Sequence, residues 1–186
     1  MKAHMKKLII LGSAVMAVST AHAQLLGAAV NGQFNINGDL STNYFDKANG
    51  FVPSGYLNSG PTGTTNVVIS NPAKEFGFYD GANLDEANFT ANTLTVHDLP
   101  DSGGAVATKY TFTSSTFAGL TMNQTSNNFA GLTATLVGNV VTVDIPAFAS
   151  GEHTAAFTFT SVPEPASFAA VGIGLAMLIR RRKKSN

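Results

Sequence analysis

The fold class is decided by the segment Leu132-Thr133-Ala134-Thr135-Leu136-Val137-Gly138-Asn139-Val140-Val141-Thr142-Val143-Asp144-Ile145. On both sides of Gly138-Asn139, apolar residues alternate with Thr or Asp, and this period of two is typical of half-buried β-strands. A Gly-Asn pair between two such runs is a signal for a two-residue turn of type I′ or II′. The segment therefore predicts a β-hairpin with one face in a core.

The same alternation recurs elsewhere in the chain. Tyr110 and Phe112 alternate with threonines, as do Phe157 and Phe159, and no window between residues 24 and 161 keeps a helical period of 3.6 residues. We expect strands near residues 28–36, 66–70, 75–79, 89–97, 107–112, 132–137, 140–145 and 155–160. About eight short strands predict an all-β fold, an antiparallel β-sandwich of jelly-roll type.

Two other features concern the connections. The sequence Phe-Ala-Gly-Leu-Thr occurs at residues 117–121 and again at 129–133, which we interpret as two loop-to-strand entries whose Phe and Leu anchor in one core. The link at residues 38–65 is rich in Gly, Pro, Asn and Ser and predicts an extended surface excursion. The 13 phenylalanines of the chain argue against a disordered spacer, because disordered segments are poor in aromatic residues.

The N-terminus has the pattern of a secretory signal. Three lysines within the first seven residues precede an apolar run at 8–18, and Ala21 and Ala23 are the small residues that signal peptidase requires. We expect a signal helix at residues 1–23, with cleavage before Gln24. The alternative is an N-terminal membrane anchor that is never cut.

The C-terminus carries a second membrane-directed pattern. An apolar run at 166–179 follows Val162-Pro163-Glu164-Pro165 and ends at the cations Arg180, Arg181, Arg182, Lys183 and Lys184. Fourteen helical residues span about 21 Å, less than the ~30 Å hydrocarbon core, so length alone would also suit a buried helix. Five consecutive cations cannot be buried unpaired and mark the cytoplasmic side. We therefore expect a single transmembrane helix.

This combination of a Pro-Glu-Pro element, one apolar segment and a basic cluster closely resembles the PEP-CTERM sorting signal of Gram-negative bacteria. The resemblance covers about the last 25 residues. It implies processing by a membrane-embedded exosortase, a transient inner-membrane intermediate facing the periplasm, and delivery to the cell surface or an exopolysaccharide matrix. The expected domains are a signal peptide at 1–23, an exported body at 24–161 and a sorting tail at 162–186.

The composition of the body limits what it can do. It holds three lysines, no arginine and ten carboxylates, a net charge of −7, so nucleic-acid binding through phosphate neutralisation is excluded. The chain has no cysteine, which removes thiol catalysis and cysteine-based metal sites. Neither a Gly-x-Ser-x-Gly elbow, a His-Glu-x-x-His motif nor a P-loop is present, and the proximity of His97 and His153 to acids establishes no catalytic pair.

Two sets of residues are candidates for ligand binding. Asp80, Asn83, Asp85 and Glu86 form the densest cluster of oxygen ligands and could hold Ca²⁺, although their spacing departs from the EF-hand pattern. The alternative is an acidic turn that ends in a short helical cap. Tyr44 and Tyr56 lie in the polar excursion and could stack on sugar rings, or they could pin that long loop to the sandwich.

The sequence thus predicts a non-catalytic structural or binding protein of the cell surface or matrix, with no required cofactor and with exopolysaccharide as a candidate partner. A Ca²⁺-dependent adhesion or carbohydrate-binding module is one alternative. Another is a polysaccharide hydrolase that uses two carboxylates among Asp80, Asp85 and Glu86, which would have to face each other across a cleft about 5–10 Å apart.

Overall fold

The computed structural model of the chain describes residues 23–45, 65–71, 74–79, 82–100 and 106–162. Within these ranges the chain forms ten β-strands and one short 3₁₀ helix, η1 (Ser115–Phe117). No helix of the described part is long and apolar enough to cross a membrane. The predicted signal helix up to residue 22 and the predicted transmembrane helix at 166–179 lie outside the described residues.

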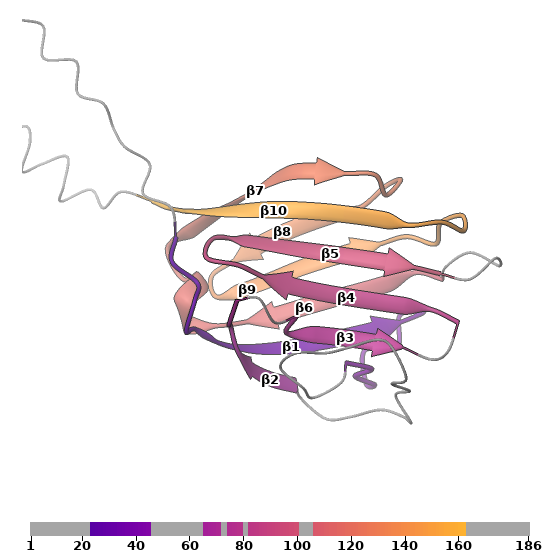
Figure 1. The fold of residues 1–186 in the computed structure, drawn as a ribbon, viewed down its shortest axis with the longest axis horizontal. Coiled ribbons are helices and arrows are strands. Elements are labelled where there is room, and N and C mark those ends of the chain that lie inside the picture. Colours follow the sequence, from indigo (N-terminus) through magenta and orange to yellow (C-terminus); the bar gives the residue numbers. More distant parts are fainter. Residues whose placement is uncertain (1–22, 46–64, 72–73, 80–81, 101–105, 163–186) are drawn as a thin grey trace, which may run out of the picture.

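The strands form two five-stranded antiparallel sheets (Figure 1). The order in the first sheet is β2 (Thr65–Val68), β1 (Ala29–Ile36), β6 (Thr108–Thr113), β9 (Val140–Ile145) and β8 (Thr133–Val137). The order in the second is β3 (Phe76–Tyr79), β4 (Leu84–Phe89), β5 (Thr93–Leu99), β10 (His153–Ser161) and β7 (Leu120–Asn127). The predicted all-β class with antiparallel sheets is confirmed, and the narrower jelly-roll topology stays a prediction.

Phenylalanine rings from both sheets fill the space between them. Phe112 of β6 lies with its ring centroid 5.1 Å from Phe89 of β4 and 5.2 Å from Phe76 of β3, and Phe45 lies 5.0 Å from Phe76. All four side chains are fully buried or nearly so. Offset and edge-on ring pairs of this kind add to the free energy gained by burying apolar area. A core of this size explains how the body holds together without disulfides.

The hairpin predicted at residues 132–145 is present as β8 and β9. Val137 and Val140 are opposite each other, and Gly138 at the first central position of the turn has φ 61°. Asn139 is not among the residues with positive φ. A positive φ at the first position alone fits a type II′ turn, where glycine is preferred because it has no Cβ to clash.

The two Phe-Ala-Gly-Leu-Thr copies act as predicted. Phe117 and Phe129 are buried, and Leu120 and Leu132 pack against the core. Gly119 and Gly131 have φ of 75° and 74°, so each copy turns the chain at its glycine before a strand, β7 or β8, begins.

The helical cap that was the alternative to a calcium site in the acidic segment is wrong, because Asp85 and Glu86 lie in a strand. Leu84–Phe89 is strand β4. The single strand expected at 89–97 instead covers the end of β4, a turn and most of β5 (Thr93–Leu99), and in that turn the amide of Thr90 donates to the carbonyl of Thr93 at 2.8 Å. Asp85 hydrogen-bonds to Tyr110 on the inner face of the sheet, and Glu86 contacts Lys74 and His97 on the outer face. These contacts stabilise the two acids in a strand, and they cannot be inferred from the periodicity of the sequence.

Strand β7 was not predicted either. Leu120–Asn127 is an edge strand whose residues are mostly exposed on both faces, so it lacks an apolar alternation. Backbone pairing with β10 and hydrogen bonds such as that between the hydroxyls of Thr121 and Thr160, 2.7 Å apart, hold it in the sheet.

The first and last described residues lie at the same end of the sandwich. The amide of Ala23 donates to the carbonyl of Phe159 at 3.4 Å, and that of Val162 donates to Gly119 at 3.2 Å. The backbone therefore stays hydrogen-bonded to the fold up to the residue at which the predicted sorting tail begins.

Candidate functional site

A tight turn at the end of β1 reverses the chain, which then runs back beside Phe34 along the edge of that strand. Asn37 and Gly38 have φ of 55° and 77°, and the amide of Asp39 donates to the carbonyl of Ile36 at 3.1 Å. Positive φ at both central positions defines a type I′ turn, for which Asn-Gly is the preferred pair. The sequence pair Asn37-Gly38 therefore determines where the following loop lies.

Hydrogen bonds hold that loop in one arrangement. The carboxylate of Asp39 accepts from the hydroxyl of Ser41 at 2.5 Å, from the hydroxyl of Thr42 at 2.8 Å and from the amide of Ser41 at 2.9 Å. The hydroxyl of Ser41 first, and then that of Thr42, keep the pKa of Asp39 below its usual value. The side-chain amide of Asn35 donates to the carbonyl of Thr42 at 2.6 Å. Leu40 stands within this hydrogen-bonded loop with 64% of its surface exposed.

An ion pair lies beside the loop on the first sheet. Lys109 of β6 and Asp144 of β9 are Cα partners, and Nζ of the lysine is 3.2 Å from Oδ1 of the aspartate. Thr133 of β8 is the partner of Asp144 on its other side. The lysine and aspartate side chains are 36% and 50% exposed, so both remain accessible to a ligand.

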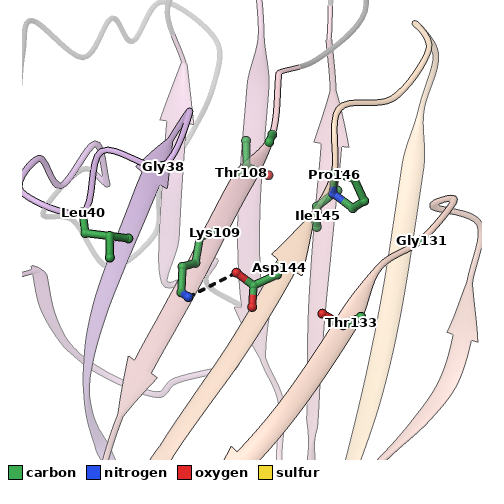
Figure 2. A pocket seen from close by; sticks show the side chains of 10 residues that line it. Gly38, Leu40, Thr108, Lys109, Gly131, Thr133, Asp144, Ile145 and Pro146 are labelled. Carbon is green, nitrogen blue, oxygen red and sulfur yellow. Dashed lines mark ion pairs between the residues drawn. The ribbon is translucent and has the colours of Figure 1, made fainter.

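Between Leu40 and Thr133 the surface is hollowed into a groove, here termed the Lys109 groove. Figure 2 shows Lys109, Asp144 and Thr133 next to one another on three neighbouring strands, with Leu40 on the far side of the lysine. The groove has a volume of about 460 Å³, within the range of about 300–1,000 Å³ found for small-ligand sites. Its lining residues are Gly38, Leu40, Ala107, Thr108, Lys109, Gly131, Thr133, Asp144, Ile145 and Pro146.

A second polar cluster lies on the outer face of the second sheet. Nζ of Lys74 is 2.6 Å from Oε1 of Glu86, and His97 places Nδ1 3.2 Å from Oε2 of Glu86 and Nε2 3.1 Å from Oε1 of Glu152. Burial by itself raises the pKa of Glu86, but the hydrogen bonds from His97 and Lys74 outweigh it, and the pKa is lowered. The hydrogen bond to Glu86 raises the pKa of His97 despite partial burial. The cluster is a charge-compensated network.

A third cluster is buried between the sheets. Asp85 and Asp98 are Cα partners on β4 and β5, and both face the hydroxyl of Tyr110 on β6. Burial raises the pKa of Asp98 to about 6, although hydrogen bonds with Tyr110 and Asp85 act to lower it. Burial also raises the pKa of Tyr110 well above its usual value. Sequence reasoning missed this group because its three members come from three strands and two sheets.

The structure does not bring the predicted calcium ligands together. Asp85 faces Tyr110 in the core, whereas its neighbour Glu86 faces Lys74 and His97 on the outer surface. Asn83 is half-buried just before β4, and Asp80 lies outside the described residues. Within the described part of the chain, no three His, Asp or Glu side chains are placed to hold a metal ion.

Of the two tyrosines considered for sugar stacking, the structure describes only Tyr44. The ring of Tyr44 packs edge-on against Phe78, with centroids 5.8 Å apart, and its amide donates to the carbonyl of Phe34 at 2.9 Å. This tyrosine thus pins its loop to the sandwich. Tyr56 lies outside the described residues.

The sorting and cleavage residues fall at the margins of the structure. Ala23 is buried and Gln24 exposed at the start of the fold, Val162 is exposed at its end, and Ala21, Pro163–Pro165 and Arg180–Lys184 lie outside the described residues.

Comparison with known proteins identifies the tail. A family model described as the PEP-CTERM protein-sorting motif matches residues 161–183, which confirms the resemblance inferred from the sequence. The motif implies processing by an exosortase, export through the membrane and sorting to the cell surface. No curated protein and no solved structure matches the chain.

Proposed function

We propose that the body, residues 24–161, is a non-catalytic structural or binding domain that the exosortase route delivers to the cell surface or to an exopolysaccharide matrix such as that of a biofilm. The observation that carries the proposal is the junction between fold and tail. The sorting motif begins at Ser161, the last residue of β10, and the amide of Val162 still donates to Gly119. The tail is therefore attached to the sandwich without a long linker.

This junction suggests a route for the body. Before processing, the apolar segment at 166–179 would span the inner membrane, with the cations at 180–184 on the cytoplasmic side and the body in the periplasm. Pro163 and Pro165 disfavour helical backbone at the residues before them, so the Pro-Glu-Pro element would stand extended between fold and membrane. Exosortase would then act on it and release the body to the surface.

The positions of the carboxylates support a non-catalytic role. Glycoside hydrolysis uses two carboxyl groups that flank one substrate bond. Asp85 and Glu86, two of the three acids that the hydrolase alternative requires, lie on opposite faces of β4 and hydrogen-bond to other side chains. For the same reason, Asp85 and Glu86 cannot bind one Ca²⁺ ion together, as the Ca²⁺-dependent adhesion alternative requires. The carbohydrate-binding alternative keeps a candidate site in the Lys109 groove.

Replacing Pro163, Glu164 and Pro165 by alanine tests the route in a strain that contains an exosortase. We expect normal export but no tail removal, so that full-length protein accumulates in the membrane fraction. Wild-type protein in a strain without the exosortase serves as the control and should accumulate in the same way. If the triple-alanine variant loses its tail and reaches the matrix at the wild-type rate, the tail is only a membrane anchor and the proposal fails.

A further inference from the structure

We propose that the Lys109 groove binds a neutral hexose unit of a polysaccharide chain. This inference names a site and a ligand class for the binding role proposed above, and in that sense it rests on that role. It follows from four properties of the groove: a fixed apolar wall, a charged donor next to a charged acceptor, a balance of charge, and a hydroxyl-bearing surface that continues beyond it.

The apolar wall suits the C–H face of a pyranose ring. Leu40 keeps 64% of its surface exposed although its loop is held by Asp39 and Asn35. Pro146 lines the groove together with it, whereas the side chain of Ile145 is buried in the core. An apolar surface that hydrogen bonds already hold in place loses little conformational entropy when a ligand binds, and this favours binding. Because the wall is aliphatic rather than aromatic, we expect a dissociation constant on the order of 1 mM.

The floor suits adjacent sugar hydroxyls. Lys109 has only donors, and the carboxylate of Asp144 has only acceptors. With their charged atoms 3.2 Å apart and both side chains partly exposed, one hydroxyl can accept from the lysine while its neighbour donates to the aspartate. Hydrogen bonds to charged groups are stronger than those between neutral groups. Thr133, beside Asp144, adds a hydroxyl that can donate or accept.

The charges favour a neutral ligand. Lys109 and Asp144 compensate each other, while the body as a whole carries three lysines against ten carboxylates. An acidic polysaccharide would meet repulsion from the body and could use only one of the two charges in the groove. A neutral sugar can bond to both without breaking the charge balance.

The neighbouring surface allows a polymer to continue past the groove. Thr111 of β6, Thr142 of β9 and Thr135 of β8 are Cα partners in one row, two residues along each strand from the Lys109–Asp144–Thr133 row. Residues two apart on a strand face the same side. The outer face of the first sheet therefore presents a row of hydroxyls next to the groove, suited to an extended chain of sugars rather than to an isolated monosaccharide.

Affinity electrophoresis tests the proposal with the protein in two forms: the full-length chain in detergent and the processed chain recovered from the cells. Gels would contain dextran, hydroxyethyl cellulose, galactomannan or, as the acidic polymer, alginate. We expect retarded migration of both forms in at least one neutral gel and none in alginate. We expect Asp144→Asn and Leu40→Ser each to lower the retardation at least fivefold. Val137→Ser, a matched change at an exposed apolar residue on the same face outside the groove, should leave it unchanged.

The outcomes separate this proposal from the delivery route. If the full-length chain binds but no processed chain is ever found, the groove assignment stands and the sorting route fails. Absence of retardation in every neutral gel overturns the groove assignment, as does equal retardation in alginate. Binding that survives both Asp144→Asn and Leu40→Ser, in variants whose thermal midpoints match the wild type, also overturns it.

Discussion

The phenol of Tyr110, on one sheet, donates a hydrogen bond to the carboxyl of Asp98, on the other sheet. The same hydroxyl lies 3.4 Å from Oδ1 of Asp85, which is the Cα partner of Asp98. Two carboxyl groups thus approach one buried phenol where the sheets face each other, with His153 as the cross-strand neighbour of Asp98. Because burial disfavours the charged form, this contact makes the stability of the sandwich depend on pH.

Asp98→Asn should remove part of that dependence. Well below pH 3.8, Asp98 is protonated in both the folded and the unfolded chain, and its burial has no electrostatic cost. As pH rises, the unfolded chain ionises first, from the usual value of 3.8, and the folded chain follows at about 6. Wild-type stability should therefore fall between pH 4 and pH 6 by up to about 3 kcal/mol. Urea denaturation should show the variant gaining stability relative to wild type over this interval. A gain that is equal at pH 3.5 and pH 7 would contradict the prediction.

Tyr110→Phe should destabilise the protein although it preserves the ring. It removes the hydroxyl that donates to Asp98 and leaves a buried carboxyl with one donor fewer, at a cost of about 1–3 kcal/mol. The cost should be larger at pH 7 than at pH 4, because the ionised carboxylate needs the donor more than the protonated acid does. Denaturant midpoints at both pH values provide the measurement. In the Asp98→Asn background, the difference between the two pH values should become small.

His97 should stabilise the folded state at acid to neutral pH and lose that effect as pH rises. Its folded pKa is raised, first by the hydrogen bond to Glu86, so its contribution is fully present below the unfolded value of 6.5 and disappears above the folded pKa. The pair is partly exposed, so we expect about 1 kcal/mol or less. An NMR titration of the ring should place the pKa above 6.5. Glu86→Gln should lower the pKa more than Glu152→Gln does, and the opposite order would refute this assignment.

Gly32→Ala should disturb the core. A Cβ at residue 32 would lie 2.3 Å from Cε1 of Phe76, whose ring is fully buried and cannot move aside freely. We expect a loss of about 1–3 kcal/mol, typical of overpacking. Phe76→Leu removes ring atoms, so in a double-mutant cycle it should offset part of that loss. Phe157→Leu, a matched change elsewhere in the core, should be additive with Gly32→Ala. Additivity in both cycles would show that the clash does not set the cost.

The hairpin and the two repeated entries were predictable because their determinants are local. Gly138 must adopt a positive φ that few other residues tolerate, and the apolar alternation on both sides sets which face is buried. Strands β4 and β7 were missed because tertiary partners stabilise them. The acids Asp85 and Glu86 become compatible with β4 only when Tyr110 approaches from one face and Lys74 and His97 from the other.

The sequence by itself determined the all-β class, the hairpin at 132–145 and the sorting tail, since each depends on residues close together in the chain and on preferences that hold in any context. Only the tertiary structure decided which side chains meet. The register of β6 against β9 joins Lys109 to Asp144, 35 positions apart, and the packing of two sheets joins Tyr110 to Asp98. Such contacts depend on strand pairing and on the exclusion of water between the sheets, and neither can be inferred from residues that are neighbours in the sequence.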